Sequence, residues 1–235
     1  MADPHTHHLA DASALAQGLA QDIGERLREA LHQRGHAVLA VSGGKSPIAL
    51  FHALRTQNLD WARVSVTLVD ERCVPRDHLD SNAALVRQHL LQGPAQDAHF
   101  LPLVDEPGPD LPDAATLVAR AQTRWQGLSH ADVTVLGIGE DGHTASLSPE
   151  ASALAQGLAR DNTERMLAVQ PLNAPHQRIS MTLAEILASA HIAIALGGPA
   201  KQAVYAKALE RVDDALPISH VLHAHHPSLA VWSHV

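Results

Sequence analysis

The sequence predicts an α/β fold with a mostly parallel sheet and helices on both of its faces. Short runs of β-branched and aliphatic residues recur along the chain, and amphipathic helical patterns separate them. The runs are continuously apolar rather than alternating, which is typical of parallel strands covered on both faces. Alternation of strand and helix in this way indicates an α/β architecture.

The first predicted element is a helix over residues 12–35, where Leu15, Leu19 and Ile23 lie four residues apart on one face and Gly35 gives a stop signal. The strands are predicted at residues 36–41, 64–69, 132–138, 166–169, 191–196 and 230–232. The helices between them are predicted at residues 47–54, 82–91, 114–125, 183–188 and 200–209. Residues 92–112 hold five prolines and two glycines, which predicts a surface connection rather than a packed element.

Length and composition predict one globular domain over residues 1–235. Hydrophobic residues make up 46% of the chain and charged ones 18%, and no apolar run approaches the roughly 18 residues of a membrane span. The first eleven residues lack the basic flank and apolar core of a secretory signal. Cys73 is the only cysteine, so no internal disulfide can form. We therefore expect a cytoplasmic protein without a membrane partner.

The charge balance argues against a nucleic-acid partner. The net charge is −8, and only six residues are aromatic, so neither a basic face nor base stacking is predicted. An anionic ligand would then need a local cluster of cations. Two of the three lysines, Lys45 and Lys201, closely follow Gly-Gly pairs, although a general drift toward arginine would also leave few lysines.

Four predicted strands run directly into loops of glycine and polar residues, at residues 42–47, 70–72, 137–143 and 197–199. In an open parallel sheet the carboxyl ends of the strands lie along one edge, where ligands bind. Loops that are distant in sequence can therefore form one site.

The loop Ser42, Gly43, Gly44, Lys45 has the composition of a phosphate cradle. Its glycines allow close backbone approach, and the proline that follows suits the first turn of a helix, whose positive end attracts anions. It is not a Walker A loop, because Leu39 stands where that motif needs glycine. An ordinary strand-to-helix turn with small residues is the alternative.

The loop at residues 137–143 contains G-x-G-x-x-G, yet a dinucleotide site is not predicted. Glu140 and Asp141 would oppose a pyrophosphate, and no acid follows at the end of a second strand. Asp141 stands two residues before His143, where a carboxylate can orient an imidazole that moves protons near neutral pH. The alternative is a tight turn with solvated polar residues.

At residues 70–72, Asp70, Glu71 and Arg72 leave a buried strand together. Arg72 either binds a phosphate or carboxylate or forms a salt bridge at the rim of the sheet. Cys73 has no paired histidine nearby in sequence and is interpreted as an unreactive thiol. A metal site is not predicted either, because no carboxylate or cysteine is interleaved among the C-terminal histidines, which are His220, His223, His225 and His226.

Taken together, the motifs resemble the 6-phosphogluconolactonase family, in order from about residue 36 to 209. They stand at residues 42–47, 70–72, 78–82, 137–147, 178–182 and 197–201. The resemblance implies a modified Rossmann-like fold shared with glucosamine-6-phosphate deaminase. It implies hydrolysis of 6-phospho-D-glucono-1,5-lactone in the oxidative pentose phosphate pathway, by a carboxylic ester hydrolase without metal or cofactor.

Residue by residue, the resemblance implies His143 as general base with Asp141 beside it. Asp70 stands at the position of the deaminase base. Around the phosphate and sugar the resemblance places Arg72, Arg178, Lys201 and the Ser42 loop. A δ-lactone is an activated ester, so one histidine and one or two cations suffice and no covalent nucleophile is required.

Two other functions stay open. One is a phosphosugar deaminase or isomerase on the same fold, whose pattern has glutamate five residues after the loop histidine, where this chain has Ser148. In the lactonase pattern an aromatic residue would be expected at that position before Pro149. The other is a non-catalytic sugar-phosphate sensor, which is disfavoured because no helix-turn-helix pattern accompanies the α/β unit.

Overall fold

The central sheet of the computed structural model, which describes residues 5–172 and 174–234, has seven strands. They are β1 (His5–Leu9), β2 (Ala37–Val41), β3 (Val64–Leu68), β5 (His99–Leu101), β6 (Val133–Gly137), β9 (His191–Gly197) and β10 (Leu229–His234). Their order is β1-β10-β9-β6-β2-β3-β5, and every neighbouring pair is parallel. The predicted parallel sheet is confirmed.

A second, antiparallel sheet was not predicted. It comprises β4 (Asp70–Arg72), β7 (Met166–Val169) and β8 (Arg178–Met181) in the order β4-β8-β7. Two expectations were wrong here: residues 166–169 are a strand of this sheet and not of the main one, and residues 70–72 are a strand and not a loop. The segment at 70–72 is short and charged, so its strand conformation depends on pairing with β8, about a hundred residues away, which local sequence does not report.

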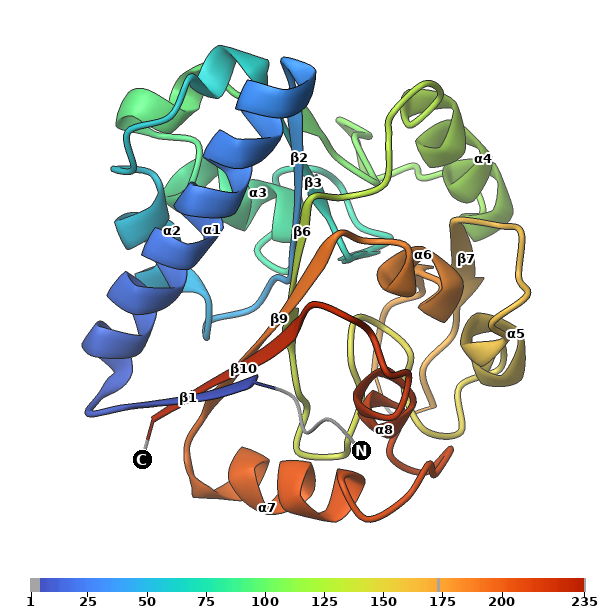
Figure 1. Ribbon diagram of the computed structural model, residues 1–235. Coiled ribbons are helices and arrows are strands. Elements are labelled where there is room, and N and C mark those ends of the chain that lie inside the picture. The colour runs from blue at the N-terminus through green and yellow to red at the C-terminus, as the bar shows by residue number, and fades with distance from the viewer. Residues whose placement is uncertain (1–4, 173, 235) are drawn as a thin grey trace.

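The helices are α1 (Ala12–Arg34), α2 (Ile48–Leu54), α3 (Asn82–His89), α4 (Ala114–Arg124), α5 (Leu154–Leu158), α6 (Leu183–Leu187), α7 (Pro199–Ala208) and α8 (Ile218–Leu222), with 3-10 turns η1 (Trp61–Arg63) and η2 (Gly93–Asp97). α1 and α2 lie on one side of the main sheet, and α4, α5 and α6 lie on the other (Figure 1). Each helix predicted from the sequence is present with ends within two residues. For α1 the ends are fixed by Asp11, whose side chain accepts the Ala14 N–H at 2.8 Å, and by Gly35 at φ +77°.

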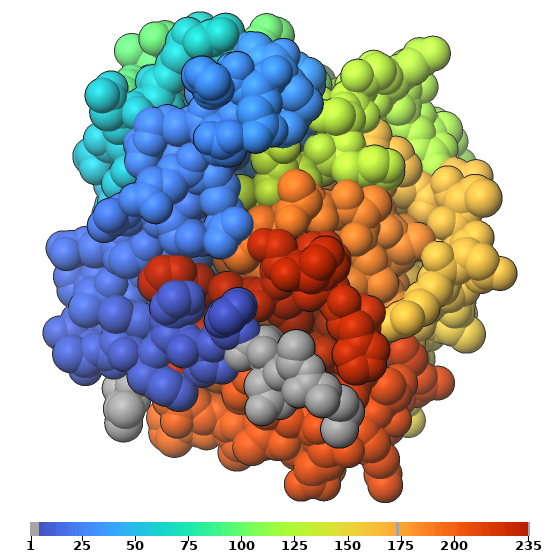
Figure 2. Space-filling view, viewed as in Figure 1, coloured from blue at the N-terminus to red at the C-terminus, as the bar shows by residue number. Residues whose placement is uncertain are grey.

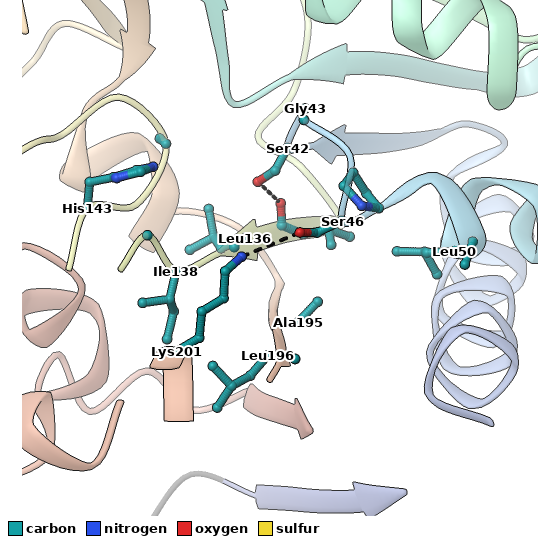
Figure 3. A pocket seen from close by; sticks show the side chains of 18 of the residues that line it. Ser42, Gly43, Ser46, Leu50, Leu136, Ile138, His143, Ala195, Leu196 and Lys201 are labelled. Atoms are coloured by element: carbon teal, nitrogen blue, oxygen red, sulfur yellow. Dashed lines mark hydrogen bonds between the residues drawn. The ribbon is translucent and has the colours of Figure 1, made fainter. Parts of the chain in front are cut away.

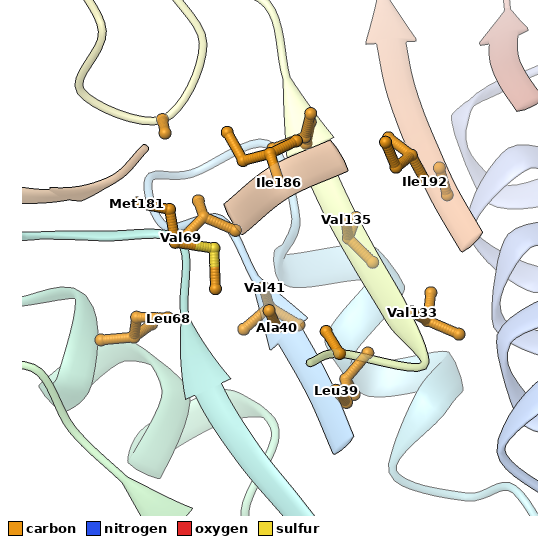
Figure 4. Packing of buried hydrophobic residues seen from close by; sticks show 14 of the residues in the cluster. Leu39, Ala40, Val41, Leu68, Val69, Val133, Val135, Met181, Ile186 and Ile192 are labelled. Carbon is orange, nitrogen blue, oxygen red and sulfur yellow. The ribbon is translucent and has the colours of Figure 1, made fainter. Parts of the chain in front are cut away.

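The core lies on both faces of the central strands, which explains their continuously apolar sequence. Every residue of β2 is buried, and Val133 and Val135 of β6 pack beside it (Figure 4). Removing one such side chain from water stabilises the fold by about 1.5–3 kcal/mol. Met181 of β8 and Ile186 of α6 belong to the same buried cluster.

The proline-rich segment at residues 92–112 is not only a surface connection. It contains η2 and the strand β5, which pairs with β3, and Leu103 and Val104 are buried. Arg124 donates to the carbonyl groups of Pro102 and Leu103 at 2.9 and 2.6 Å. The expectation failed because edge strands tolerate proline nearby and are recognised by pairing rather than by composition.

The first and last strands lie side by side, since β1 pairs in parallel with β10 at the edge of the sheet (Figures 1 and 2). β1 was not predicted, because His5, Thr6, His7 and His8 are polar and exposed. No helix in the described residues is long and apolar enough to cross a membrane.

The chain reverses its direction of travel across the sheet between β2 and β6. From β2 it proceeds through β3 to β5 on one side, and β6 is followed by β9 and β10 on the other. Such a reversal leaves a crevice outside the carboxyl ends of the two strands, where α/β proteins bind ligands. The loops that follow β2 and β6 are the ones that the sequence singles out.

Candidate active site

A cavity of about 600 Å³ opens at the carboxyl ends of the main-sheet strands. Eight predicted site residues line it, namely Ser42, Gly43, Gly44, Asp70, Arg72, His143, Arg178 and Lys201. Lys45 is exposed and does not belong to this lining, so the structure does not bring it to the others. Asp141 stands behind the lining and contacts the cavity through His143.

Asp141 and His143 form a close pair in the loop after β6. Asp141 Oδ1 lies 2.5 Å from His143 Nδ1 and also accepts the His143 backbone N–H at 3.1 Å. The hydrogen bond from His143 lowers the pKa of Asp141 to about 2. An ionised carboxylate at Nδ1 favours the tautomer with the proton on that nitrogen, which leaves Nε2 as a proton acceptor.

Two glycines allow loops to approach each other closely around the cavity. A Cβ at Gly139 would lie 2.0 Å from His143 Nδ1, so the histidine folds back over this residue. A Cβ at Gly43 would lie 1.9 Å from Asn82 Oδ1, which brings the loop after β2 against the start of α3. Any larger residue at either position would displace these side chains.

Arg72 and Arg178 lie directly opposite each other on the paired strands β4 and β8. Like charges in this position destabilise a sheet unless an anion lies between them. Within the described part of the chain, the Nε atoms of both arginines are buried and have no hydrogen-bond partner. Burial also lowers the pKa of Arg178. The pair is therefore suited to bind a phosphate or carboxylate.

Lys201 reaches into the cavity from the first turn of α7. Its Nζ donates to Ser46 Oγ at 3.4 Å, which joins α7 to the loop after β2. His143 lies on the opposite side of the cavity from this loop (Figure 3). A ligand in the cavity can thus have its anionic group near Lys201 and another atom near the histidine.

Asp70 lies in a buried network of hydroxyl groups. Ser146 donates to Asp70 Oδ2 at 2.6 Å, and its own backbone N–H donates to Ser180 Oγ at 3.1 Å. Arg178 Nη1 approaches Ser146 Oγ at 3.5 Å. Asn82 donates to the Asp70 carbonyl at 2.9 Å. Asp70 is thereby held at the cavity wall by three segments of the chain.

Glu71 faces the other way and fastens the start of α3. Its carboxylate accepts the backbone N–H groups of Arg72, Asn82 and Ala83 at 2.7–2.8 Å. Burial raises the pKa of Glu71 to about 7, against the effect of these donors. The salt bridge of Arg72 that the sequence left open is not formed, since the Arg72 guanidinium donates to the carbonyl of Asp80 instead.

The remaining candidates from the sequence lie outside the cavity. Burial raises the pKa of Cys73 to about 11, as expected for an unreactive thiol. Three of the four C-terminal histidines bind separate partners: His220 contacts Asp214 at 2.8 Å, and His223 and His226 contact the carbonyl groups of Ala208 and Ser189.

The sequence interpretation missed Ser46 and Asn82, which line the cavity, and Ser146, which binds Asp70. Ser46 and Ser146 belong to motifs already recognised, but no spacing rule assigns a hydroxyl group to a partner 76 residues away. Asn82 ends the motif at residues 78–82, but only the fold reveals that its side chain lies against Gly43.

Comparison with known proteins identifies relatives of the whole chain. The family model "Glucosamine-6-phosphate isomerases/6-phosphogluconolactonase" matches residues 10–232. A 6-phosphogluconolactonase of Pseudomonas putida is 44% identical over 92% of this chain and 88% of its own length. A 6-phosphogluconolactonase of Neisseria meningitidis is 40% identical over 92% of this chain and 93% of its own length.

Solved structures agree with the sequence relatives. The crystal structure of a 6-phosphogluconolactonase from Shewanella baltica has a TM-score of 0.93 at 37% identity and covers 99% of this chain and 98% of that one. A monomeric glucosamine-6-phosphate deaminase shares the fold, with a TM-score of 0.76 at 20% identity over 98% and 97% of the two chains. The chain belongs to the glucosamine-6-phosphate isomerase/6-phosphogluconolactonase family.

Proposed function

We propose that this protein hydrolyses 6-phospho-D-glucono-1,5-lactone to 6-phospho-D-gluconate, as a carboxylic ester hydrolase of the oxidative pentose phosphate pathway. The observation that carries this proposal is a single cavity that holds both His143, with Asp141 behind it, and the cations Arg72, Arg178 and Lys201. The 6-phosphogluconolactonase relatives at 40–44% identity support the choice of substrate.

The cations bind the phosphate of the lactone. Arg72 and Arg178 offer planar donors from adjacent strands, and Lys201 offers a point charge from the first turn of α7. They concentrate positive charge in a chain whose net charge is −8. Backbone groups of Ser42, Gly43 and Gly44 line the same cavity and complete the phosphate and sugar site.

The histidine activates the water. His143 Nε2 accepts a proton as the water oxygen attacks the lactone carbonyl carbon and forms a tetrahedral oxyanion. The oxyanion collapses, the bond between that carbon and the ring oxygen breaks, and the proton on Nε2 passes to the ring oxygen. The carboxylic acid that results ionises to the product carboxylate. Asp141 stabilises the imidazolium in between.

Asp70 is proposed as the third member of the catalytic group. It lines the cavity, and Ser146 and Asn82 fix its carboxylate and main chain. In a lactonase its charge orients the bound sugar or water. No metal or cofactor is required, because the ester is already activated and a base with neighbouring cations supplies the chemistry. We also propose that the protein acts in the cytoplasm and that residues 1–235 form one domain.

Replacement of His143 by alanine tests the proposal. Lactone loss, corrected for spontaneous hydrolysis, should show kcat lowered by about 10²- to 10⁴-fold, the scale of a positioned general base. The exposed His99 gives a control, and His99→Ala should retain parent activity. Parent-like turnover in a folded His143→Ala protein would remove this histidine from the mechanism. A parent protein without lactonase activity would refute the function.

A further inference from the structure

Two histidines and an aspartate meet beside the cavity, outside the proposed active site. His78 and Asp80 lie in the loop between β4 and α3, and His176 lies just before β8. The Asp80 Oδ2 atom is 3.2 Å from His176 Nε2 and 3.8 Å from His78 Nδ1. The donor atoms of all three side chains lie within 4.8 Å of one another.

These distances approach those of a metal site. In a tetrahedral zinc site with bonds of about 2.0–2.2 Å, ligand atoms are about 3.4 Å apart. Two imidazoles and one carboxylate form a ligand set for zinc and similar transition metals, whereas Mg²⁺ and Ca²⁺ prefer oxygen alone. All three side chains are at least partly exposed, so an ion can enter from solvent.

The backbone already holds the two segments together. The Cys73 N–H donates to the Gln177 carbonyl at 2.8 Å, so the chain on either side of the cluster is paired. His78 Nδ1 accepts the Asp80 N–H at 3.1 Å, which requires that this nitrogen carries no proton. A metal at Nδ1 would replace that N–H as the partner of the nitrogen lone pair.

The other histidines that the structure describes do not form such a group. Among residues 5–172 and 174–234, the cluster of His78, Asp80 and His176 is the one whose donor atoms converge. His7 is occupied by stacking on Trp232, with ring centroids 4.0 Å apart. His8 binds Ser233 at 2.7 Å.

We propose that His78, Asp80 and His176 bind a divalent transition metal of the zinc class at the rim of the cavity. The site is accessory to the reaction, since none of the three side chains lines the cavity. It connects to the cavity through Asp80, whose carbonyl accepts a hydrogen bond from Arg72. An ion there would hold the loop at residues 75–81 against the start of β8 and restrain it.

Titration with Zn²⁺ against a chromophoric chelator tests the site in the full chain. His176→Ala and Asp80→Asn should each remove one bound ion or weaken its binding by about 10-fold or more, since even indirect partners of metal ligands affect affinity by 10- to 100-fold. The matched control is His225→Asn, which removes one of the C-terminal histidines. It should bind Zn²⁺ like the parent.

Hydrogen exchange locates the ion independently. Zn²⁺ should slow amide exchange at residues 75–81 in the parent and not in His176→Ala. Protection at residues 5–9 instead would assign the metal to the N-terminal histidines and overturn the proposal. Parent-like Zn²⁺ binding in both variants, or no binding in the parent, would overturn it as well, and the cluster would then be an ion-pair network only.

Discussion

Asp141 Oδ1 contacts both the side chain and the backbone of His143, at 2.5 Å from Nδ1 and 3.1 Å from the amide nitrogen. The two contacts fix the ring and its tautomer at once. Because the pKa of Asp141 is about 2, its carboxylate remains charged at neutral pH and well below it. The proton transfer that we propose for His143 would therefore take place beside a constant negative charge.

Asp141→Asn should lower kcat by about 10- to 100-fold. The amide keeps the shape of the carboxylate but loses the charge-assisted hydrogen bond, which contributes about 1.5–3 kcal/mol. Product binding should change little, because the phosphate ligands are untouched. Lactone turnover and the affinity for 6-phosphogluconate, both measured for one preparation, check this. An unchanged kcat would show that His143 needs no partner.

Arg72→Ala and Lys201→Ala should each weaken inhibition by 6-phosphogluconate by about 10-fold or more. Under the proposed function each variant loses one charge-assisted hydrogen bond to the phosphate, and 1.4 kcal/mol corresponds to a tenfold change. Lys207→Ala is the control, since Lys207 lies on the same helix as Lys201 and is exposed away from the cavity. If both variants bind the product as tightly as the parent, the phosphate lies elsewhere.

Gly43→Ala should abolish most activity even though alanine is small. Its Cβ would overlap the Asn82 side chain at 1.9–2.5 Å, so the loop after β2 or the start of α3 must move. Gly108→Ala has open space around it and should behave like the parent. Steady-state kinetics and thermal unfolding of the two variants separate a displaced site from a lost fold. Parent-like kinetics in Gly43→Ala would contradict the close approach.

The sequence predicts the main sheet and the helices well, because the apolar runs of β2 and β6 and the four-residue spacing in α1 report burial directly. It does not predict β4 or β8, which are short segments whose strand conformation depends on their mutual pairing. The loops after β2 and β6 were located by their glycines. Glycine positions do not reveal that Arg72 and Arg178 lie opposite each other, because neither segment alone determines the register between the two strands.

Glu71→Gln should change how stability depends on pH. Burial raises the native pKa of Glu71 from 4.5 to about 7, so the folded protein retains this proton more tightly than the unfolded chain does. The parent is therefore most stable below about pH 4.5 with respect to this group, and it loses stability as the pH rises to about 7. Glutamine does not titrate, so the stability of Glu71→Gln does not fall over this pH range on account of residue 71.

Urea unfolding at pH 5 and pH 8 checks this difference. Glutamine presents an NH₂ group to backbone donors, so Glu71→Gln should be less stable than the parent at pH 5. Its deficit should shrink at pH 8 by about 3 kcal/mol at most. Glu210→Gln, at an exposed position, should follow the parent at both values. A deficit that grows with pH would mean that burial does not favour the protonated form of Glu71.

The preparation that hydrolyses the lactone should release no detectable ammonia from glucosamine 6-phosphate. The two substrates must be compared because a monomeric glucosamine-6-phosphate deaminase shares this fold, with a TM-score of 0.76. The deaminase pattern has a glutamate five residues after the loop histidine, and Ser148 at that position cannot hold a negative charge. Glu150 is exposed and adopts φ +58°, so it does not replace that glutamate in the interior of the site.

Asp70 is the position that resembles the deaminase base and is present in both patterns, so its presence alone does not separate the two reactions. The deaminase reaction opens the sugar ring and deprotonates C2. Because no carboxylate stands five residues after His143 to control it, we expect neither step here. Both substrates are therefore assayed at equal enzyme concentration, with Asp70→Asn alongside. Ammonia release that scales with enzyme and disappears in Asp70→Asn would assign the chain to the deaminases, whereas lactone loss alone assigns it to the lactonases.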